Sequence, residues 1–175
     1  LLSGYQAVLM SPTEVLAGQH YQTAEQILGA LGFNIALFTR TNAIINGEKV
    51  SKKELLAKIS SGEVKFIIGT HALIQDTVEF NNLALAIVDE QHRFGVRQRK
   101  TLKNSNKNLY QPHFLSLTAT PIPRSLALVF YGELSISIIK QKPIGRLPVI
   151  TKAVLEKERM DAYNFIRKQI ISGHQ

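Results

Sequence analysis

The fold is decided by the stretch Leu83-Ala84-Leu85-Ala86-Ile87-Val88-Asp89-Glu90-Gln91-His92-Arg93-Phe94-Gly95. Six apolar residues come first, and the carboxylates of Asp89 and Glu90 follow them directly. A continuous apolar run of this length is typical of a strand buried on both faces, as in a parallel sheet covered by helices. Open sheets of this kind bind their ligands at the carboxyl ends of the strands, where these two acids would lie.

Two adjacent carboxylates at the end of a buried strand suit the hydrolysis of a nucleoside triphosphate. Asp89 would hold Mg²⁺, usually through water because this ion dehydrates reluctantly, and Glu90 would orient or deprotonate the attacking water. The alternative is a buried strand followed by an acidic turn that has no chemistry. His92 and a second motif downstream favour the hydrolase interpretation.

Apolar and amphipathic segments alternate along the rest of the chain. This pattern predicts an α/β fold with a mostly parallel sheet flanked by helices. Strands are expected at residues 6–10, 33–39, 64–68, 83–88, 114–117 and 134–139. Ser11 and Ser51 are each followed three residues later by a glutamate, which predicts a capping box at the start of two helices. Residues 40–50 are polar and are expected to be turn-like, and a third helix is expected at about 156–171. The first helix is expected to bury Val15, Leu16, Ala24, Ile27, Leu28 and Leu31.

Composition narrows the classes of function. The 175 residues include 21 Lys and Arg against 13 Asp and Glu, which gives a formal net charge of +8. Such a surplus favours a polyanionic partner such as nucleic acid. No run of eighteen apolar residues and no signal peptide are visible, so no membrane association is expected. The absence of cysteine excludes disulfides and thiolate metal sites and fits a cytoplasmic protein. The first residue is not methionine, which suggests a piece of a longer protein.

Asp89-Glu90-Gln91-His92 resembles motif II of the superfamily 2 helicases, best known in the spelling DEAH. The extension Arg93-Phe94-Gly95-Val96 and the segment Thr118-Ala119-Thr120-Pro121-Ile122-Pro123-Arg124 narrow the likeness to the RecG family of bacterial branched-DNA helicases. Gln91 favours that family over a relative, the transcription-repair coupling factor. The resemblance runs from about Gly4 to Gln175. It implies a RecA-like P-loop NTPase fold, ATP and Mg²⁺ as cofactors, and DNA as the partner.

The resemblance also implies roles for individual residues. Asp89 and Glu90 are expected to be catalytic, with Asp89 as the Mg²⁺ ligand. The residues expected to couple the nucleotide to DNA are Gln91, His92, Thr118, Ala119 and Thr120, the last three in motif III. DNA contacts are expected from motif Ia (Pro12, Thr13, Glu14), motif Ib (Gly69, Thr70, His71) and Arg93, Arg97, Arg99 and Arg124. Asp89 or His92 is expected to hydrogen-bond motif III.

Each proposed DNA contact has a simpler alternative. Residues 12–14 can be a routine helix cap, and His71 can be a structural histidine. The basic run from Arg93 to Lys107 can be a solvated helix face. The lysines at 49, 52, 53 and 58 are interpreted in that way, and not as a DNA site.

The chain lacks a GxxxxGK[ST] phosphate loop, because none of its eleven glycines is followed by Lys-Ser or Lys-Thr. Residues 1–142 are therefore interpreted as the trailing part of the first RecA-like lobe. Residues 143–148, with two prolines and a glycine, are the expected linker, and residues 149–175 the start of the second lobe. Such a fragment is expected to bind Mg-ATP weakly and to hydrolyse essentially none.

Three functions compete. The leading one is the monomeric motor of an ATP-dependent bacterial helicase that remodels replication forks and Holliday junctions in recombination and repair. The second is a non-catalytic nucleic-acid-binding module, whose affinity would fall steeply with salt and would not depend on Glu90. The third is the motor of a transcription-repair coupling factor, which would contact RNA polymerase.

Overall fold

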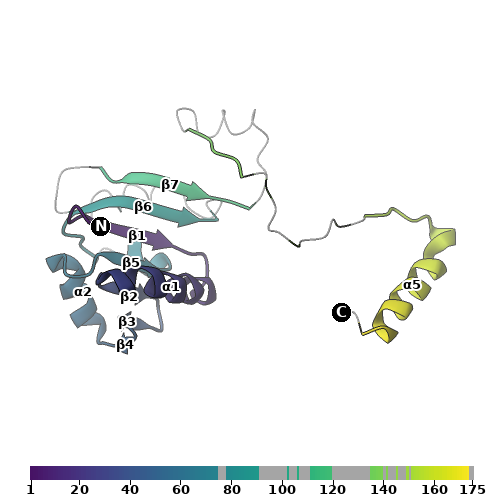
Figure 1. Cartoon of the computed structure of the whole chain (residues 1–175), viewed down its shortest axis with the longest axis horizontal. Helices are drawn as coiled ribbons and strands as arrows, with labels where there is room; N and C mark the ends of the chain where they lie inside the picture. Colours follow the sequence, from purple (N-terminus) through teal and green to yellow (C-terminus); the bar gives the residue numbers. More distant parts are fainter. Residues whose placement is uncertain are drawn as a thin grey trace. The chain divides into compact units, whose positions relative to one another are not determined.

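A computed structural model describes residues 1–74, 78–90, 102, 106, 111–119, 135–139, 141, 145, 149 and 151–173. The chain divides into two compact units, Leu1–Leu126 and Ala127–Gln175 (Figure 1). The predicted linker at residues 143–148 falls within the second unit, and only Gly145 of it is described. The predicted boundary between the lobes therefore stays a prediction.

The described part of the first unit is built on a seven-stranded sheet in the order β4-β3-β2-β5-β1-β6-β7 (Figure 1). The strands are β1 (Gln6–Met10), β2 (Ile35–Phe38), β3 (Ala43–Ile45), β4 (Glu48–Lys49), β5 (Phe66–Gly69), β6 (Leu83–Asp89) and β7 (His113–Leu117). Neighbours from β2 through β7 in this order are parallel, while β3 pairs antiparallel with β2 and with β4. The predicted mostly parallel sheet is confirmed.

The β3–β4 hairpin lies where the sequence was expected to be turn-like, so that prediction was wrong. Its turn is made by Asn46 and Gly47, which both have positive φ, 47° and 82°. Paired positive φ values match the right-handed twist of the strands that a two-residue turn joins, and Asn-Gly is the sequence that favours them. The dipeptide was therefore a hairpin signal inside an otherwise polar segment.

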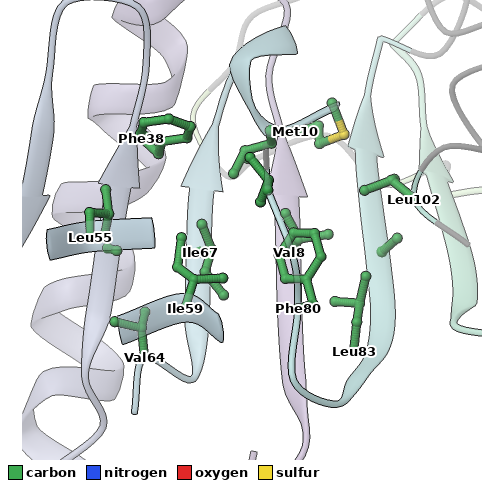
Figure 2. Packing of buried hydrophobic residues seen from close by; sticks show 14 of the residues in the cluster. Val8, Met10, Phe38, Leu55, Ile59, Val64, Ile67, Phe80, Leu83 and Leu102 are labelled. Atoms are coloured by element: carbon green, nitrogen blue, oxygen red, sulfur yellow. The ribbon is translucent and has the colours of Figure 1, made fainter. Parts of the chain in front are cut away.

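Different helices cover the two faces of the sheet. On one face, α1 (Glu14–Leu28) packs Ala17 and Tyr21 against β2 and β5. On the other, α2 (Lys52–Ser61) contributes Leu55 and Ile59 to a larger cluster over the parallel strands. Figure 2 shows members of this cluster, including Val8, Met10, Phe38, Ile67, Phe80, Leu83 and Leu102. In β6, Leu83, Ala86 and Val88 are buried and the remaining residues are half-buried, so the expected burial of this strand on both faces is met only in part.

The start of α1 differs from the prediction. Its cap is Thr13, whose hydroxyl accepts a hydrogen bond from the Leu16 amide at 3.3 Å, and not Ser11. Ser11 is buried where β1 ends, so its hydroxyl does not serve the helix. The buried face of α1 also differs, because Val15 is 73% exposed. The residues that face the sheet are Ala17 and Tyr21, with Ala24 and Leu28 partly buried, whereas Ile27 and Leu31 are exposed.

The start of α2 matches the prediction. Ser51 is the cap, and its hydroxyl accepts a hydrogen bond from the Glu54 amide at 3.1 Å. The helix ends at Gly62, which has the left-handed φ of 80° that glycine tolerates best. Leu55 and Ile59, one turn apart, are fully buried. The local cap and the apolar spacing thus agreed with the tertiary packing.

Gln6 joins three segments at the amino end of the sheet. Its amide nitrogen donates to the carbonyls of Ile59 and Val64, at 2.9 and 2.8 Å. Its amide oxygen accepts from the backbone amides of Asn81 and Asn82, at 2.8 and 3.1 Å. Gln6 is 1% exposed, so these bonds satisfy a polar side chain that water does not reach.

Tyr21 anchors α1 to the β3–β4 turn. Its hydroxyl donates to Glu25 Oε1 at 2.6 Å and accepts from the Gly47 amide at 2.7 Å. Burial, followed by the hydrogen bond to Glu25, raises the pKa of Tyr21 to about 12. The neutral phenol is therefore the form that the folded protein stabilises.

The second unit contains a short 3₁₀ helix, η4 (Glu156–Glu158), followed by α5 (Arg159–Ile171). This confirms the helix expected near the end of the chain. Residues 135–139 were expected to be part of a strand, but they adopt no regular structure and are exposed. Within the described residues, no helix is long and apolar enough to cross a membrane.

Candidate nucleotide and DNA site

The carboxyl ends of four parallel strands lie in one row. The backbone register aligns Phe38 of β2, Gly69 of β5, Met10 of β1 and Val88 of β6. The residues that follow in the chain are polar: Thr39, Thr70, Ser11 and Asp89. This edge therefore collects motif II and the predicted motifs Ia and Ib in one place, as expected for strands that run in the same direction.

Asp89 is the last residue of β6, and its carboxylate contacts α1. Asp89 Oδ2 lies 3.4 Å from His20 Nε2, and the two side chains are 22% and 38% exposed. With Nε2 protonated, His20 donates to the carboxylate and restricts its rotation. His20 therefore lies beside Asp89, the residue that the sequence predicts to bind Mg²⁺.

Glu90 follows with a backbone φ of 53°, in the left-handed region. A non-glycine residue pays about 1–2 kcal/mol for this conformation, and such outliers cluster at functional sites. The turn places Glu90 with Asp89, Ser11 and His71 around a cavity of about 10 Å³. Met10, Pro12 and Val88 complete its lining, and a cavity of this size has the volume of about one water molecule.

Asp89 fits the expected Mg²⁺ ligand. Its second carboxylate oxygen has no hydrogen-bond partner in the described part of the chain, and the side chain is accessible. No group of three or more metal-ligating side chains exists among the described residues. Mg²⁺ is usually held by one or two carboxylates together with water and substrate phosphates, so a single accessible aspartate is sufficient.

Motif III begins beside motif II. Strand β7 pairs with β6 so that Leu117 lies opposite Asp89, and Thr118 and Ala119 follow Leu117. Among the described residues the Asp89 carboxylate contacts His20, and its expected hydrogen bond to motif III stays a prediction. His92, the other expected partner of motif III, lies outside the described residues.

Motif Ia starts α1. Pro12 lines the small cavity beside Asp89, and Thr13 is the helix cap. The carboxylate of Glu14 accepts a hydrogen bond from the Thr41 hydroxyl, in the loop after β2. Glu14 therefore ties α1 to the neighbouring strand end, a role that needs no DNA.

Motif Ib follows β5. Gly69 is buried, and a Cβ there would lie 2.0 Å from the Phe38 carbonyl oxygen, so the approach of β2 requires glycine. Thr70 is 9% exposed, while His71 is exposed and begins the 3₁₀ helix η2 (His71–Ile74). Of the three, His71 is the most accessible to a ligand.

Several predicted site residues lie outside the described residues: Gln91, His92, Arg93, Arg97, Arg99, Thr120 and Arg124. Their roles stay predictions. Sequence reasoning also passed over residues that the fold brings to the edge. His20 ends the stretch of residues 12–20 that resembles motif Ia, but it was given no role beside Asp89. Arg40, which directly follows the buried Thr39 after β2, was not chosen.

Residues 1–129 match the model of the DEAD/DEAH box helicase family. The match covers more than half of the chain, and the chain belongs to this family. Asp89 and Glu90, at the end of β6, lie within the matched residues.

Within the family, the chain is similar over its whole length to ATP-dependent DNA helicase RecG. It is 46% identical to RecG of Aquifex aeolicus (strain VF5) over 173 residues, which cover 99% of this chain and 21% of that protein. It is also 46% identical to RecG of Synechocystis sp. over 176 residues, covering 100% of this chain and 20% of that protein. The expected resemblance to RecG is confirmed, and the chain spans about a fifth of the length of these relatives.

A solved structure shows the same likeness. The structure of RecG bound to a three-way DNA junction matches with a TM-score of 0.71 and 35% sequence identity, over 97% of this chain and 22% of that chain. This confirms the predicted RecA-like helicase fold.

Proposed function

We propose that the chain is part of the motor of an ATP-dependent DNA helicase that remodels branched DNA. The observation that carries the proposal is the position of Asp89 and Glu90, at the tip of an interior parallel strand in a chain that resembles RecG throughout. We further propose that the whole protein acts as a monomer in the bacterial cytoplasm. The RecG relatives favour this motor over a transcription-repair coupling factor.

In this proposal Asp89 and Glu90, the acidic half of the carboxyl edge of the sheet, bind and hydrolyse the nucleotide. Asp89 holds Mg²⁺ through water, and Glu90 orients or deprotonates the attacking water. Mg²⁺ supplies charge that neutralises the triphosphate. His20 restricts the Asp89 carboxylate, and Thr118 and Ala119, which follow β7, couple this site to DNA.

DNA is proposed to lie along the motif Ia and Ib residues of the same edge. His71 is the accessible member of motif Ib, and Pro12 lines the same cavity as His71. Because DNA and nucleotide would bind along the same strand ends, closure of the site around the nucleotide can move the residues that hold DNA. Such coupling converts hydrolysis into movement.

The test is ATP hydrolysis by the full-length helicase, with and without a three-way DNA junction. Replacing Glu90 by Gln should lower the DNA-stimulated turnover by about 10²–10⁴-fold, because it removes a general base, while junction binding is retained. Glu79→Gln is the matched control, since Glu79 is an exposed acid shortly before β6. This control should leave turnover within about twofold of the wild type.

Two outcomes would count against the motor. Full turnover in Glu90→Gln would remove Glu90 from the chemical step. No turnover in the wild type, combined with salt-sensitive DNA binding, would establish the non-catalytic binding module instead. The isolated 175-residue chain should hydrolyse essentially no ATP, and robust turnover by it would contradict the assignment of an incomplete site.

A further inference from the structure

A second cavity opens at the other half of the edge, between the carboxyl ends of β2 and β5. Its volume is about 370 Å³, which falls in the range of about 300–1,000 Å³ typical of ligand sites. Its polar lining consists of Thr39, Arg40, Lys52, Thr70 and His71. His71 also lines the small cavity beside Asp89, so the two cavities share a wall.

The two cations of this cavity have no acidic partner in the part of the chain that the structure describes. None of the ion pairs among the described residues includes Arg40 or Lys52. Lys52 Nζ donates to the Arg40 carbonyl at 2.7 Å, which holds the ammonium group at the cavity and leaves two of its three donors. The Arg40 guanidinium, with five N–H donors, bonds to no described residue. The cavity therefore presents unused positive charge and unused donors.

Lys52 also occupies an unfavourable position for a cation. It is the first residue of α2, where the positive end of the helix dipole disfavours a cation. The acid of the first turn, Glu54, does not compensate it, because Glu54 pairs with Lys58 at 3.5 Å. A bound anion would remove this repulsion.

We propose that this cavity binds a phosphate of the DNA backbone, with Arg40 and Lys52 as its charged contacts. The proposal rests on the proposed function as a DNA motor. Arginine suits the role because its planar guanidinium binds phosphate through two parallel hydrogen bonds. The cavity lies two to three strand spacings from β6, about 10–14 Å at about 4.8 Å per strand, so a phosphate can bind there without contacting Asp89.

The experiment measures junction DNA binding by the full-length helicase between 50 and 200 mM salt. In the double variant Arg40→Met, Lys52→Met, the slope of log affinity against log salt should fall by about 0.7–0.9, the loss of one phosphate contact. The matched control is Lys49→Met, Lys53→Met, which removes the same charge from exposed lysines that do not line the cavity. Its slope should change by less than half as much.

Additional measurements separate the possible failures. Arg40→Met alone keeps the Lys52 bond to the residue 40 carbonyl, so it should still weaken DNA binding without disturbing the loop. Mg-ATP affinity and DNA-independent hydrolysis should not change in any of these variants. Equal effects of the double variant and its control would overturn the site, and weakened Mg-ATP binding with normal DNA binding would make it a nucleotide phosphate site instead. Absence of DNA binding by the wild type would overturn the proposed function itself.

Discussion

The two halves of the carboxyl edge carry opposite charge on the same backbone framework. At β6 the strand delivers Asp89 and Glu90, whereas beyond β2 the cavity presents Arg40 and Lys52. An acidic strand end can engage a polyanion only through a bridging metal ion, while a basic one can bind it directly. Parallel strands thus bring two ways of binding phosphate to one edge of the sheet. The residues that follow each strand determine whether the binding there is direct or through a metal ion.

The distance between the halves makes them separable by experiment. Two to three inter-strand steps of about 4.8 Å place them about 10–14 Å apart. This exceeds the Debye length of about 8 Å at physiological ionic strength, so a charge changed in one half is largely screened at the other. Variants should therefore affect nucleotide chemistry or DNA binding, but not both.

The largest effect is expected at the acidic half. Asp89→Asn removes the negative charge that we propose holds Mg²⁺. A loss of about 3 kcal/mol in transition-state stabilisation corresponds to about a 100-fold lower kcat. Junction affinity should stay within about twofold, because the basic half is untouched. Steady-state ATP hydrolysis and DNA titration of the full-length helicase would check both numbers. A parallel loss of DNA affinity would break the separation of the halves.

A substitution of Gln6 is expected to lower the thermal stability of both halves together, since Gln6 belongs to β1, which lies between them. Gln6→Leu removes four hydrogen bonds and leaves buried backbone groups unsatisfied, at a cost of about 3 kcal/mol. The thermal midpoints of ATP hydrolysis and of DNA binding should then fall together, by about 6–12 °C. Gln26→Leu makes the same change on the exposed face of α1 and should shift neither midpoint appreciably. Separate shifts of the two midpoints would show that the two halves do not unfold as one unit.

The sequence predicted the acidic half better than the basic half, and the reason is physical. The apolar run before Asp89 is a local signal, because six consecutive apolar residues are typical of a strand inside a parallel sheet. The cap at Ser51 is equally local. Arg40 and Lys52 are twelve residues apart, and only the β3–β4 hairpin folds the chain so that both line one cavity.

The helix cap predicted from the sequence was also wrong, because two nearby residues have side chains that can cap a helix. Ser11 and Thr13 can both cap a helix, and the burial of Ser11 at the strand end decides for Thr13. The contact between His20 and Asp89 joins residues 69 positions apart, so no spacing rule indicates it. Such pairs emerge only from the packing of α1 against the sheet.

A smaller effect is expected from Tyr21, which holds the helix that starts between the two halves. Its pKa is raised to about 12, so the neutral phenol stabilises the fold fully below pH 10, and this contribution is lost as pH rises from about 10 to 12. The loss should amount to about 1 kcal/mol. Between pH 9 and pH 11, the thermal midpoint of the wild type should fall more than that of Tyr21→Phe, for ATP hydrolysis and DNA binding alike. Equal pH dependence of the two proteins would exclude this role.

The smallest effect tests an acid placed next to the basic half. Glu14 accepts a hydrogen bond from Thr41, one residue after Arg40, and Glu14→Gln keeps an acceptor oxygen but removes the negative charge. If Glu14 only anchors the loop, junction affinity should rise about twofold, because an exposed charge of this kind is worth about 0.2–1 kcal/mol. Glu48→Gln, an exposed acid on β4, should change affinity less, and turnover should not change in either variant. Weaker junction binding in Glu14→Gln would instead make Glu14 a direct DNA contact, as the resemblance to motif Ia predicts.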